Sequence, residues 1–547
     1  MGSEKQAEAG NRDVWFYRIL AVGLILVAAV LRCIYLAWFC QLDLAGDEAH
    51  YWDWSRNLEL SYYSKGPLVA YLIHVSCALL GPWSEAQFGN MMFAVRFPAV
   101  VCGSLLVLSL YVLTSQVFKR ELLSLLVVML ALTMPTINAG SLIMTIDSPF
   151  CCCWGWALVL GYQAIFRKSA WAWPLLGLAI GVGILAKYNM ILWVFSIFCF
   201  ALFTKKYRSL FRDPGMWVAL GIGALCCTPI IIWNVQNDWV GLFHVQTLAG
   251  VRNNDSFIKW MGPLAYLGTQ CALLLGFGFV LWARGMWTLA PWKSKTTPEV
   301  AYLWWMSATT FLLFFGFSFK TGGGEPNWPL AAYLSGMVLA AGWLDRYVQQ
   351  YSAQGKAALR GTALTSLFGL GLTFLALQPS WTLPTLKVIA GPPTKEHPLP
   401  IRKWDVTRRL RGWQTLAENV DQVNEELRKK GEEPVIAAAL WQIPGELGFY
   451  CKDHPKVYSI GLAFNCRHTQ YDYWHPNPVQ DPKPFLGKTF IYVGAVHPRL
   501  REAFEKIGPT RRVIHKEQDY PVAIWDVTVC YGYKGFPIQT YQDDDKY

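Results

Sequence analysis

The first apolar run of the chain, WFYRILAVGLILVAAVLRCIYLAWF at residues 15–39, is about 25 residues long. A run of this length can cross the hydrocarbon of a bilayer as one helix, and it is longer than the apolar core of a secretory signal peptide. The N-terminal sequence has no A-x-A-like cleavage site after a short apolar core. We therefore expect a membrane protein that keeps this first helix.

Ten more apolar runs of spanning character follow, so we predict a polytopic protein. Of the 547 residues, 54% are hydrophobic and only 16% are charged, whereas a soluble protein carries about a quarter charged residues. The deficit ends near residue 378, which predicts an all-α membrane domain over 1–378 and a soluble domain over 379–547. The further runs lie at 93–118, 121–134, 149–166, 171–186, 189–204, 216–233, 262–283, 301–319, 328–345 and 359–378.

The loops between these runs predict the orientation of the helices. Basic residues gather in loops at 119–120, 167–168, 205–212, 284–295 and 346–360, and the positive-inside rule places these loops in the cytoplasm. The alternation works only if the short run 67–81, flanked by Pro67 and Pro82, does not change sides. We therefore predict about eleven spans plus a re-entrant or interfacial helix, with the C-terminal domain outside. The net charge of +11 fits these loops, and no basic tract with interleaved aromatics points to nucleic acid.

A carboxylate pair stands in the stretch GDEAHYWDW at residues 46–54, just after the first span. Asp47 and Glu48 could supply a general base or hold a divalent cation at the membrane boundary. The structural alternative is that Asp47 is the N-cap of an outer helix running to about Leu58, with Glu48 in its first turn. The two interpretations are compatible, because a capping carboxylate can also face a cleft.

The stretch YYSKGP at residues 62–67 follows the carboxylate pair. Lys65 is a candidate contact for a phosphate at the membrane surface, and the alternative is an interfacial lysine that extends its ammonium towards water. Tyr62 and Tyr63 fit either interpretation.

Three further polar features fall on the predicted outer side. Asp147 begins a span in TIDSP, where it or Ser148 could simply cap the helix ahead of Pro149. Lys187 separates two apolar runs, and a charge so close to the hydrocarbon is a functional candidate. The stretch KTGGGEPNW at residues 320–328 reads equally well as a mobile lid or as a plain connection. The gathering of these groups on one side is the best evidence in the sequence for a single site.

Residues 379–547 alternate strand and helix signals, which predicts a small α/β layer. Strands are expected at 435–439, 489–493 and 522–527, and a helix over 416–427 is expected to stop near Gly431. The spacing of Leu500, Phe504 and Ile507 predicts another helix that ends at 508–509. This domain has no phosphate-binding loop and no nucleophile motif, so acceptor recognition and packing are the two roles considered.

Together these residues resemble the polytopic glycosyltransferases that use lipid-linked sugars, the GT-C superfamily. The resemblance is greatest to the protein O-mannosyltransferase and aminoarabinose-transferase types, glycosyltransferase families 39 and 83. One departure is that these families commonly have two prolines after the lysine, whereas Gly66 takes the first position here. The motifs that carry the resemblance are Asp47-Glu48, Tyr63-Ser64-Lys65-Gly66-Pro67, Arg96-Phe97-Pro98-Ala99, Ile146-Asp147-Ser148-Pro149, Leu185-Ala186-Lys187 and Asn327-Trp328-Pro329.

The resemblance implies a donor in which a sugar is joined through phosphate to a polyprenyl chain, and transfer with inversion at the outer face of the inner or plasma membrane. The acceptor would be a lipid, a glycan or a protein hydroxyl of the envelope. Asp47 would be the catalytic carboxylate, with Glu48 as a partner or orienter and a divalent cation near Asp47 as a candidate. The predicted substrate-binding residues are Tyr62, Tyr63, Lys65, Asp147, Lys187, Lys320, Glu325 and Asn327.

Two other functions would also place polar groups at a membrane surface. A transporter or flippase of lipid-linked glycans is the main alternative, but such proteins often show internal repeats and midplane sites, and no clear repeat is visible here. A non-catalytic envelope scaffold would leave the one-sided cluster unexplained.

Overall fold

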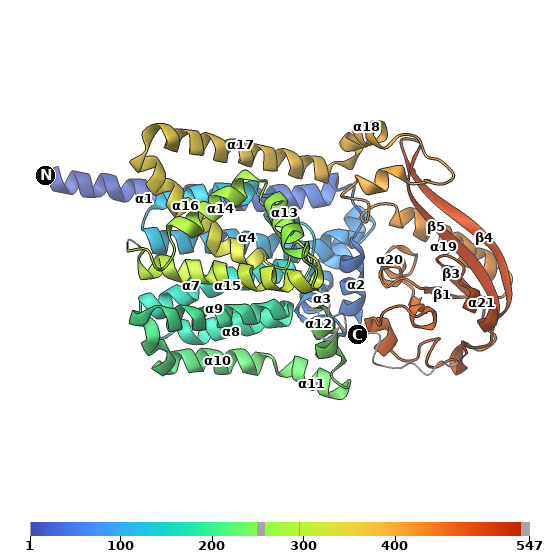
Figure 1. Ribbon diagram of the computed structural model, residues 1–547. Coiled ribbons are helices and arrows are strands. Elements are labelled where there is room, and N and C mark those ends of the chain that lie inside the picture. Colours follow the sequence, from blue (N-terminus) through green and yellow to red (C-terminus); the bar gives the residue numbers. More distant parts are fainter. Residues whose placement is uncertain (1, 249–257, 295, 538–547) are drawn as a thin grey trace. The chain divides into compact units, whose positions relative to one another are not determined.

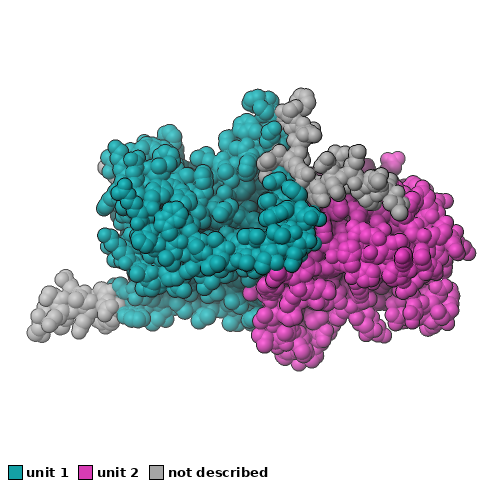
Figure 2. All heavy atoms as spheres, turned by 90° about the horizontal axis from the view of Figure 1, so that it is seen from below, with its two compact units in different colours: residues 1–38, 65–69, 96–373 teal, residues 39–64, 70–95, 374–547 magenta. Residues whose placement is uncertain are grey.

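The computed structural model describes residues 2–248, 258–294 and 296–537, and it divides into two compact units. Unit 1 comprises residues 1–38, 65–69 and 96–373, and unit 2 comprises 39–64, 70–95 and 374–547 (Figure 2). The sequence predicted one boundary, after residue 378. The C-terminal part instead forms its compact unit together with two segments from the first hundred residues, and one of these segments carries Asp47.

Unit 1 is helical, and every apolar run predicted within it forms helix. Figure 1 shows its longer helices running side by side. Among the described residues of the whole chain, seven helices are long and apolar enough to cross a membrane, or eight if a bent pair counts as one. Several of the eleven predicted spans are shorter helices. The helices of unit 1 are α1 (Gly2–Ile34), which continues as the π-helix η1 (Tyr35–Phe39), α4 (Met92–Phe118), α5 (Glu121–Thr133), α6 (Pro135–Gly140), α7 (Asp147–Phe166), α8 (Ala172–Ala186), η2 (Tyr188–Met190), α9 (Ile191–Phe203), η3 (Lys205–Arg212), α10 (Pro214–Cys226), α11 (Thr228–Gln236), α12 (Val240–Leu248), α13 (Gly262–Leu273), α14 (Phe277–Thr288), α15 (Pro298–Thr321), α16 (Leu330–Gln350) and α17 (Ser352–Leu377).

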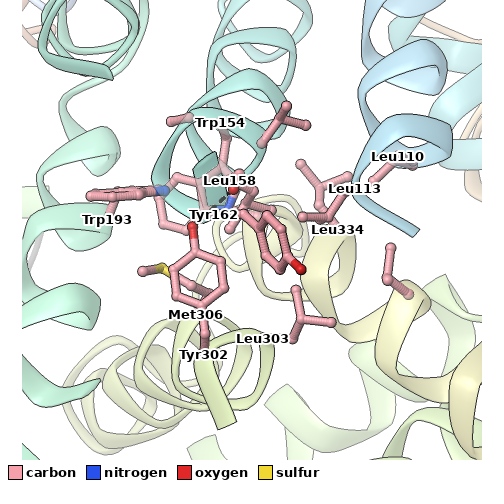
Figure 3. Close-up of a cluster of buried hydrophobic side chains, with 14 of the residues drawn as sticks. Leu110, Leu113, Trp154, Leu158, Tyr162, Trp193, Tyr302, Leu303, Met306 and Leu334 are labelled. Carbon is pink, nitrogen blue, oxygen red and sulfur yellow. Dashed lines mark hydrogen bonds between the residues drawn. The ribbon is translucent and has the colours of Figure 1, made fainter. Parts of the chain in front are cut away.

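The core of unit 1 lies between α4, α7, α9, α15 and α16. Figure 3 shows how large side chains from these helices, including Trp154, Trp193 and Tyr302, gather in one cluster. Gly161 permits this packing, because a Cβ at that position would lie 2.6 Å from the Tyr302 hydroxyl. By contrast only 6% of the apolar window of α17 is buried, against 72% for α7. An apolar surface left open in this way is suited to contact with lipid rather than water.

The run predicted as one span at 262–283 is broken. Helices α13 and α14 meet at a bend of 110°. Leu275 and Gly276 both have positive φ at the break, 57° and 68°, and this backbone cannot continue a right-handed helix. The predicted run is therefore two helices joined at a sharp bend, and its crossing of the membrane as one span stays a prediction.

The short run predicted at 67–81 is part of a longer helix in the structure. It forms α3 (Leu68–Phe88), a helix of 21 residues that continues through Pro82 and is itself long and apolar enough to be a candidate span. Pro82 therefore does not end the helix, as its position in the sequence had suggested. A re-entrant or interfacial course for this helix stays a prediction.

Unit 2 contains a five-stranded mixed sheet in the order β2-β1-β3-β5-β4. The first three strands in this order are parallel, and β5 and β4 form a long antiparallel hairpin. The three predicted strands are present, whereas β2 and β4 were missed. Besides α3, the elements are α2 (Gly46–Arg56), α18 (Pro379–Ala390), η4 (Pro400–Lys403), α19 (Trp413–Arg428), β1 (Val435–Ala438), α20 (Gln442–Tyr450), β2 (Tyr458–Ser459), η5 (Gly461–Phe464), η6 (Gln470–Tyr473), η7 (Lys483–Phe485), β3 (Phe490–Val493), α21 (Pro498–Ala503), β4 (Phe504–Glu517) and β5 (Tyr520–Tyr533).

The helix predicted from Leu500, Phe504 and Ile507 is wrong beyond residue 503. Helix α21 stops at Ala503, and the chain enters β4 at Phe504. Phe504 pairs with Tyr533 of β5 in the antiparallel ladder. Pairing over a 14-residue strand satisfies far more backbone groups than one additional helical turn could, so the tertiary context overrides the local spacing.

Candidate functional site: an ion pair beside an apolar cavity

Three of the predicted site residues meet in unit 1. The Lys187 ammonium lies 2.6 Å from Asp147 Oδ1 and donates a hydrogen bond to it. The Asn327 side-chain amide donates to the other carboxylate oxygen, Oδ2, at 2.7 Å. Residues separated by 40 and 180 positions in the sequence therefore hold both oxygens of one carboxylate.

The local structure explains why Asp147 is available for this contact. It is the first residue of α7, and the residue before it, Ile146, provides no side-chain cap. The Ser148 hydroxyl donates instead to the carbonyls of Gly140 and Ile143. Helix capping, the structural alternative for Asp147 and Ser148, is therefore wrong, because both side chains bond to groups from other segments.

Lys187 sits at a break between α8 and η2, where its backbone is extended (φ −148°, ψ 126°). Its side chain is buried, and the ammonium lies 5.5 Å from the centroid of the Phe150 ring. A buried ammonium needs a compensating charge, and Asp147 supplies it. The ion pair is thus part of the interior of the unit.

The glycine that departs from the family pattern has a steric explanation. A Cβ at Gly66 would lie 2.2 Å from the carbonyl oxygen of Leu185, so neither proline nor any other residue with a Cβ fits without a shift. This close approach places the backbone next to Lys65 against the end of α8, two residues before Lys187. Lys65, which is half-buried, therefore begins a segment that is anchored beside the ion pair.

The basic loop at 119–120 lies near the end of α16 that is farther from Asn327. Arg120 forms an ion pair with Asp345, and Arg18 forms one with Glu121 at 2.8 Å. Asp345 is in the last turns of α16, whereas Asn327 lies just before the start of the same helix. A helix of 21 residues separates the two sets of contacts, and the orientation of the basic loops towards the cytoplasm stays a prediction.

Asp147 also lines a cavity whose other walls are mainly apolar. A second cavity extends along α5, α14, α16 and α17, and its walls are almost wholly apolar. Four residues line both cavities: Met134, Leu274, Tyr333 and Met337. Unit 1 therefore contains two adjoining apolar cavities, and a carboxylate stands in the wall of one of them.

The connection between α15 and α16 holds the remaining predicted residues of unit 1. Lys320 and Glu325 have exposed side chains, and the structure does not bring them to the ion pair. The connection is anchored, because Gln270 donates to the Pro326 carbonyl at 3.2 Å and accepts from the Tyr333 hydroxyl at 2.8 Å. These bonds favour the plain connection over the mobile lid.

Asp47 and Glu48 lie in α2 of unit 2. Glu48 is fully buried, and its carboxylate accepts the backbone N–H of Ala45 at 2.9 Å, which caps the helix. Asp47 is one residue inside the helix, so the prediction that Asp47 is the N-cap is wrong. Glu48 has the capping role, and the Asp47 carboxylate is 3.4 Å from the Tyr51 hydroxyl.

Tyr62 and Tyr63 are both buried in unit 2. The Tyr62 ring stacks on Trp54 with centroids 4.2 Å apart, and its hydroxyl donates to the carbonyls of Trp54 and Asn57. The Tyr63 ring stacks on Tyr473 at 5.4 Å. A substrate contact by Tyr62 stays a prediction, and its burial argues against it.

Other groups on α2 were not singled out from the sequence. His50 is buried among aromatic rings, and this burial, with the nearby Arg467 charge, lowers its pKa to about 3. Burial raises the pKa of Asp53, while the ion pair with Arg56 at 2.5 Å acts in the opposite direction. The signal in the sequence that could have identified these two residues is their position in the stretch 46–56, which is rich in aromatic and charged residues. Among the described residues, no group of three or more His, Cys, Asp or Glu side chains is placed to hold a metal, so a cation at Asp47 stays a prediction.

Comparisons with known proteins agree with this architecture. Residues 64–233 match the family model described as dolichyl-phosphate-mannose-protein mannosyltransferase. The chain is 25% identical to the lipid A galacturonosyltransferase RgtD of Rhizobium johnstonii over 59% of its length and 64% of that protein. It is 26% identical to the undecaprenyl phosphate-alpha-4-amino-4-deoxy-L-arabinose arabinosyl transferase of Pseudomonas paraeruginosa over 67% of its length and 65% of that protein. The alignments thus span slightly less than two thirds of these relatives.

The fold is similar to that of ArnT from Cupriavidus metallidurans, solved bound to undecaprenyl phosphate. The TM-score is 0.58 at 15% identity, and the match covers 94% of this chain and 98% of ArnT. The apo structure of the same protein matches with a TM-score of 0.55. The similarity extends over both units, including the C-terminal sheet. The chain is therefore an integral membrane protein with the fold of ArnT, and its sequence is similar to those of glycosyltransferases that are named for lipid-linked donors or for lipid A.

Proposed function

We propose that the chain is a glycosyltransferase that moves a sugar from a polyprenyl-phosphate donor to an acceptor of the cell envelope. The names of two relatives support the two halves of this proposal: one is an undecaprenyl phosphate-aminoarabinose arabinosyl transferase, and the other is a lipid A galacturonosyltransferase. The proposal places the reaction, Asp47 and unit 2 on the extracytoplasmic side of the inner or plasma membrane. A lipid-linked saccharide is the acceptor class favoured by the RgtD similarity.

The observation that carries the proposal is the shape and chemistry of the space in unit 1. Two neighbouring apolar cavities, one of which has the Asp147 carboxylate in its wall, suit a ligand with a hydrocarbon tail and a polar head. Tail burial would supply binding free energy at about 25 cal/mol per Å² of apolar surface removed from water. A polyprenyl phosphate has this combination of a long tail and a charged head.

The proposed chemistry is a single displacement with inversion. The acceptor hydroxyl attacks the anomeric carbon, the bond from that carbon to the phosphate oxygen breaks, and the polyprenyl phosphate leaves with the bonding electrons. Asp47 takes the hydroxyl proton as general base. Lys65 stabilises the negative charge that grows on the phosphate.

Asp147 is assigned a different role from Asp47. Lys187 and Asn327 each hold one of its two oxygens, at 2.6 and 2.7 Å. We assign the three residues to shaping the polar end of the cavity, with Lys187 and Asn327 as positioning residues for Asp147. Tyr63 and the exposed Lys320 and Glu325 remain candidates for contacts with the substrates.

The direct test uses purified protein in nanodiscs with radiolabelled polyprenyl-phosphate sugars and a lipid A acceptor. Asp47→Asn should reduce transfer at least a thousandfold without changing the thermal unfolding temperature, because it removes the base and keeps the size. Asp453→Asn is the matched control, since it makes the same change at an exposed position of unit 2 where positive φ suits Asn. This control should transfer at the wild-type rate.

The role of Lys65 has a separate readout. Lys65→Ala should raise the KM for the donor by tenfold or more and leave the KM for the acceptor nearly unchanged. A rise in the KM for the acceptor alone would refute a contact between Lys65 and the donor phosphate. If wild-type protein moves labelled donor between leaflets without cleaving the sugar–phosphate bond, the protein is a flippase and the proposed function is wrong.

A further inference from the structure

We propose that Asp43 is a positioning residue that docks helix α2 onto the start of α19 and thereby fixes the place of Asp47. The inference concerns unit 2 alone and rests on the proposed role of Asp47. It gives the C-terminal α/β domain a specific task, which is to hold the segment that carries the catalytic carboxylate.

The start of α19 lacks a cap of its own. The N-cap residue is Gly412, in the left-handed region at φ 90°. A Cβ there would lie within 2.9 Å of Trp525 and His515, so no capping side chain can be carried at this position. The first backbone N–H groups of a helix must nevertheless find acceptors, and a negative charge is favoured there.

Asp43 supplies that acceptor from a position 370 residues earlier in the chain. Its carboxylate accepts the backbone N–H of Trp413 at 2.8 Å and the side-chain amide of Gln414 at 2.9 Å. Its own backbone N–H donates to the Leu410 carbonyl at 2.8 Å. Asp43 is only 6% exposed, so these bonds form away from bulk water, where they restrict motion most.

The two residues after Asp43 also form hydrogen bonds that anchor the chain up to the start of α2. The N–H of Leu44 donates to the Tyr450 hydroxyl at 2.7 Å, and Ala45 donates to Glu48 at the first turn. Farther along α2, a Cβ on Gly445 of α20 would lie 2.8 Å from the backbone of Ala49, so the two helices touch without intervening side chains. Asp47 lies between these two fixed points.

The consequence for catalysis follows from the short distance along the chain. Only three residues separate Asp43 from Asp47, and the first turn of α2 cannot move independently of the segment before it. Misplacing a catalytic group by about 1 Å can cost a hundredfold in rate. Loss of the Asp43 docking should therefore lower kcat more than it alters substrate binding.

The test compares Asp43→Ala, Asp43→Asn and the control Asp213→Ala in the full-length protein in nanodiscs. Asp43→Ala should lower kcat at least tenfold with both KM values within threefold of wild type. Asp43→Asn should stay within threefold of wild type in kcat, because the Asn oxygen can accept from Trp413 and the Gln414 amide can turn to pair with the Asn amide. Asp213 caps α10 by accepting from Gly215 N–H at 2.8 Å, so its loss removes a bond of the same kind in unit 1 and should leave kcat unchanged.

A second measurement is independent of turnover. Hydrogen exchange read by mass spectrometry should show at least tenfold faster exchange over residues 42–52 in Asp43→Ala, with the β1, β3 and β5 amides unchanged. Unchanged exchange over 42–52 would overturn the docking, and faster exchange with wild-type kcat would overturn the positioning. If the wild-type protein transfers no sugar, the proposed function and the positioning role both fail, while the exchange result still decides whether Asp43 holds α2.

Discussion

His50 is a buried titratable residue whose ring is enclosed by aromatic side chains. Its centroid lies 4.8 Å from that of Trp54, 5.0 Å from Tyr471 and 5.7 Å from Trp441. Its Nδ1 atom is buried with no hydrogen-bond partner among the described residues. Protonation would place a charge in this apolar setting, which is why the pKa falls to about 3 from the ordinary 6.5.

This shift predicts an acid-sensitive unit 2. Between pH 6.5 and 3 the unfolded chain binds a proton at His50 that the folded chain does not, so the His50 contribution to stability is lost as pH falls through this window. The difference in free energy of unfolding between wild type and His50→Phe should shrink by about 1.4 kcal/mol per pH unit from pH 6 to 4. Thermal unfolding of both proteins across this range measures it, and a constant difference would contradict the pKa.

Asp472 is a control, because its titration should change the stability of unit 2 with pH in the direction opposite to that of His50. Burial raises its pKa to about 6 from 3.8, although hydrogen bonds from Thr469 act against the shift. The folded chain therefore binds more protons at Asp472 than the unfolded chain between pH 3.8 and 6, and stability falls as pH rises. Replacing Asp472 with Asn should remove that loss, so the variant gains on wild type as pH rises across the same window.

At the scale of single residues, the sequence identified chemical types better than it identified contacts. Asp147, Lys187 and Asn327 could be chosen because charges and amides are costly near a membrane and tend to be functional. The sequence does not contain the information that they bond to one another, because the bond depends on how three helices pack. Asp43 and Gln414 had no signal of their own, since an acidic residue before a helix and a glutamine within one are common.

At the scale of elements, the break between α5 and α6 shows how a membrane helix can be interrupted. Pro135 ends the α5 ladder and leaves carbonyls without helical partners. The Asn138 amide donates to the Leu132 and Met134 carbonyls at 2.9 and 3.2 Å. Its oxygen accepts from Arg32 of α1 at 2.9 Å, so one side chain satisfies the break and a buried guanidinium together.

This arrangement predicts that Asn138→Leu is strongly destabilising. The change keeps the volume but leaves the Leu132 carbonyl and the Arg32 charge without their partner, while the Met134 carbonyl keeps the bond from the Asn138 backbone N–H, and an uncompensated buried charge costs about 3–5 kcal/mol. Thermal unfolding in detergent measures the loss. The double variant Arg32→Leu with Asn138→Leu should recover part of it, because the charge is gone. No recovery would show that the Leu132 carbonyl, rather than the guanidinium, dominates.

The elements that the sequence predicted poorly share one cause. Each hydrophobic run predicted within unit 1 forms helix, since burial from water or contact with lipid imposes that composition, whereas the short helices α6 and α12 lie outside the predicted runs. The bend between α13 and α14 and strand β4 were missed because each depends on partners elsewhere in the chain. The bend needs two adjacent residues with positive φ, and β4 needs the whole length of β5.

At the scale of the whole molecule, the notable feature is that unit 2 is discontinuous. Residues 39–64 and 70–95 fold with 374–547, although the span-forming helices of unit 1 intervene in the sequence. Helix α2 buries Ala49, Trp52 and Trp54 within this unit. The boundary at 378 was drawn where the composition changes from apolar to soluble. Composition cannot show that residues 39–64 fold with the C-terminal part, because this segment is short and lies between two apolar runs.

The discontinuity predicts that residues 379–547 alone form an incomplete unit. Without α2, the close-packed face of α20 around Gly445 becomes an exposed surface and α19 loses the Asp43 carboxylate. A synthetic peptide of residues 39–64 should bind and stabilise the fragment. At a hundredfold excess over its Kd the gain is about 2.7 kcal/mol, or roughly 5–10 °C in Tm for a domain of this size. The same peptide with Ala49→Arg, which cannot approach Gly445, should have no effect. A Tm independent of the wild-type peptide, up to its solubility limit, would show that α2 contributes little to the stability of unit 2.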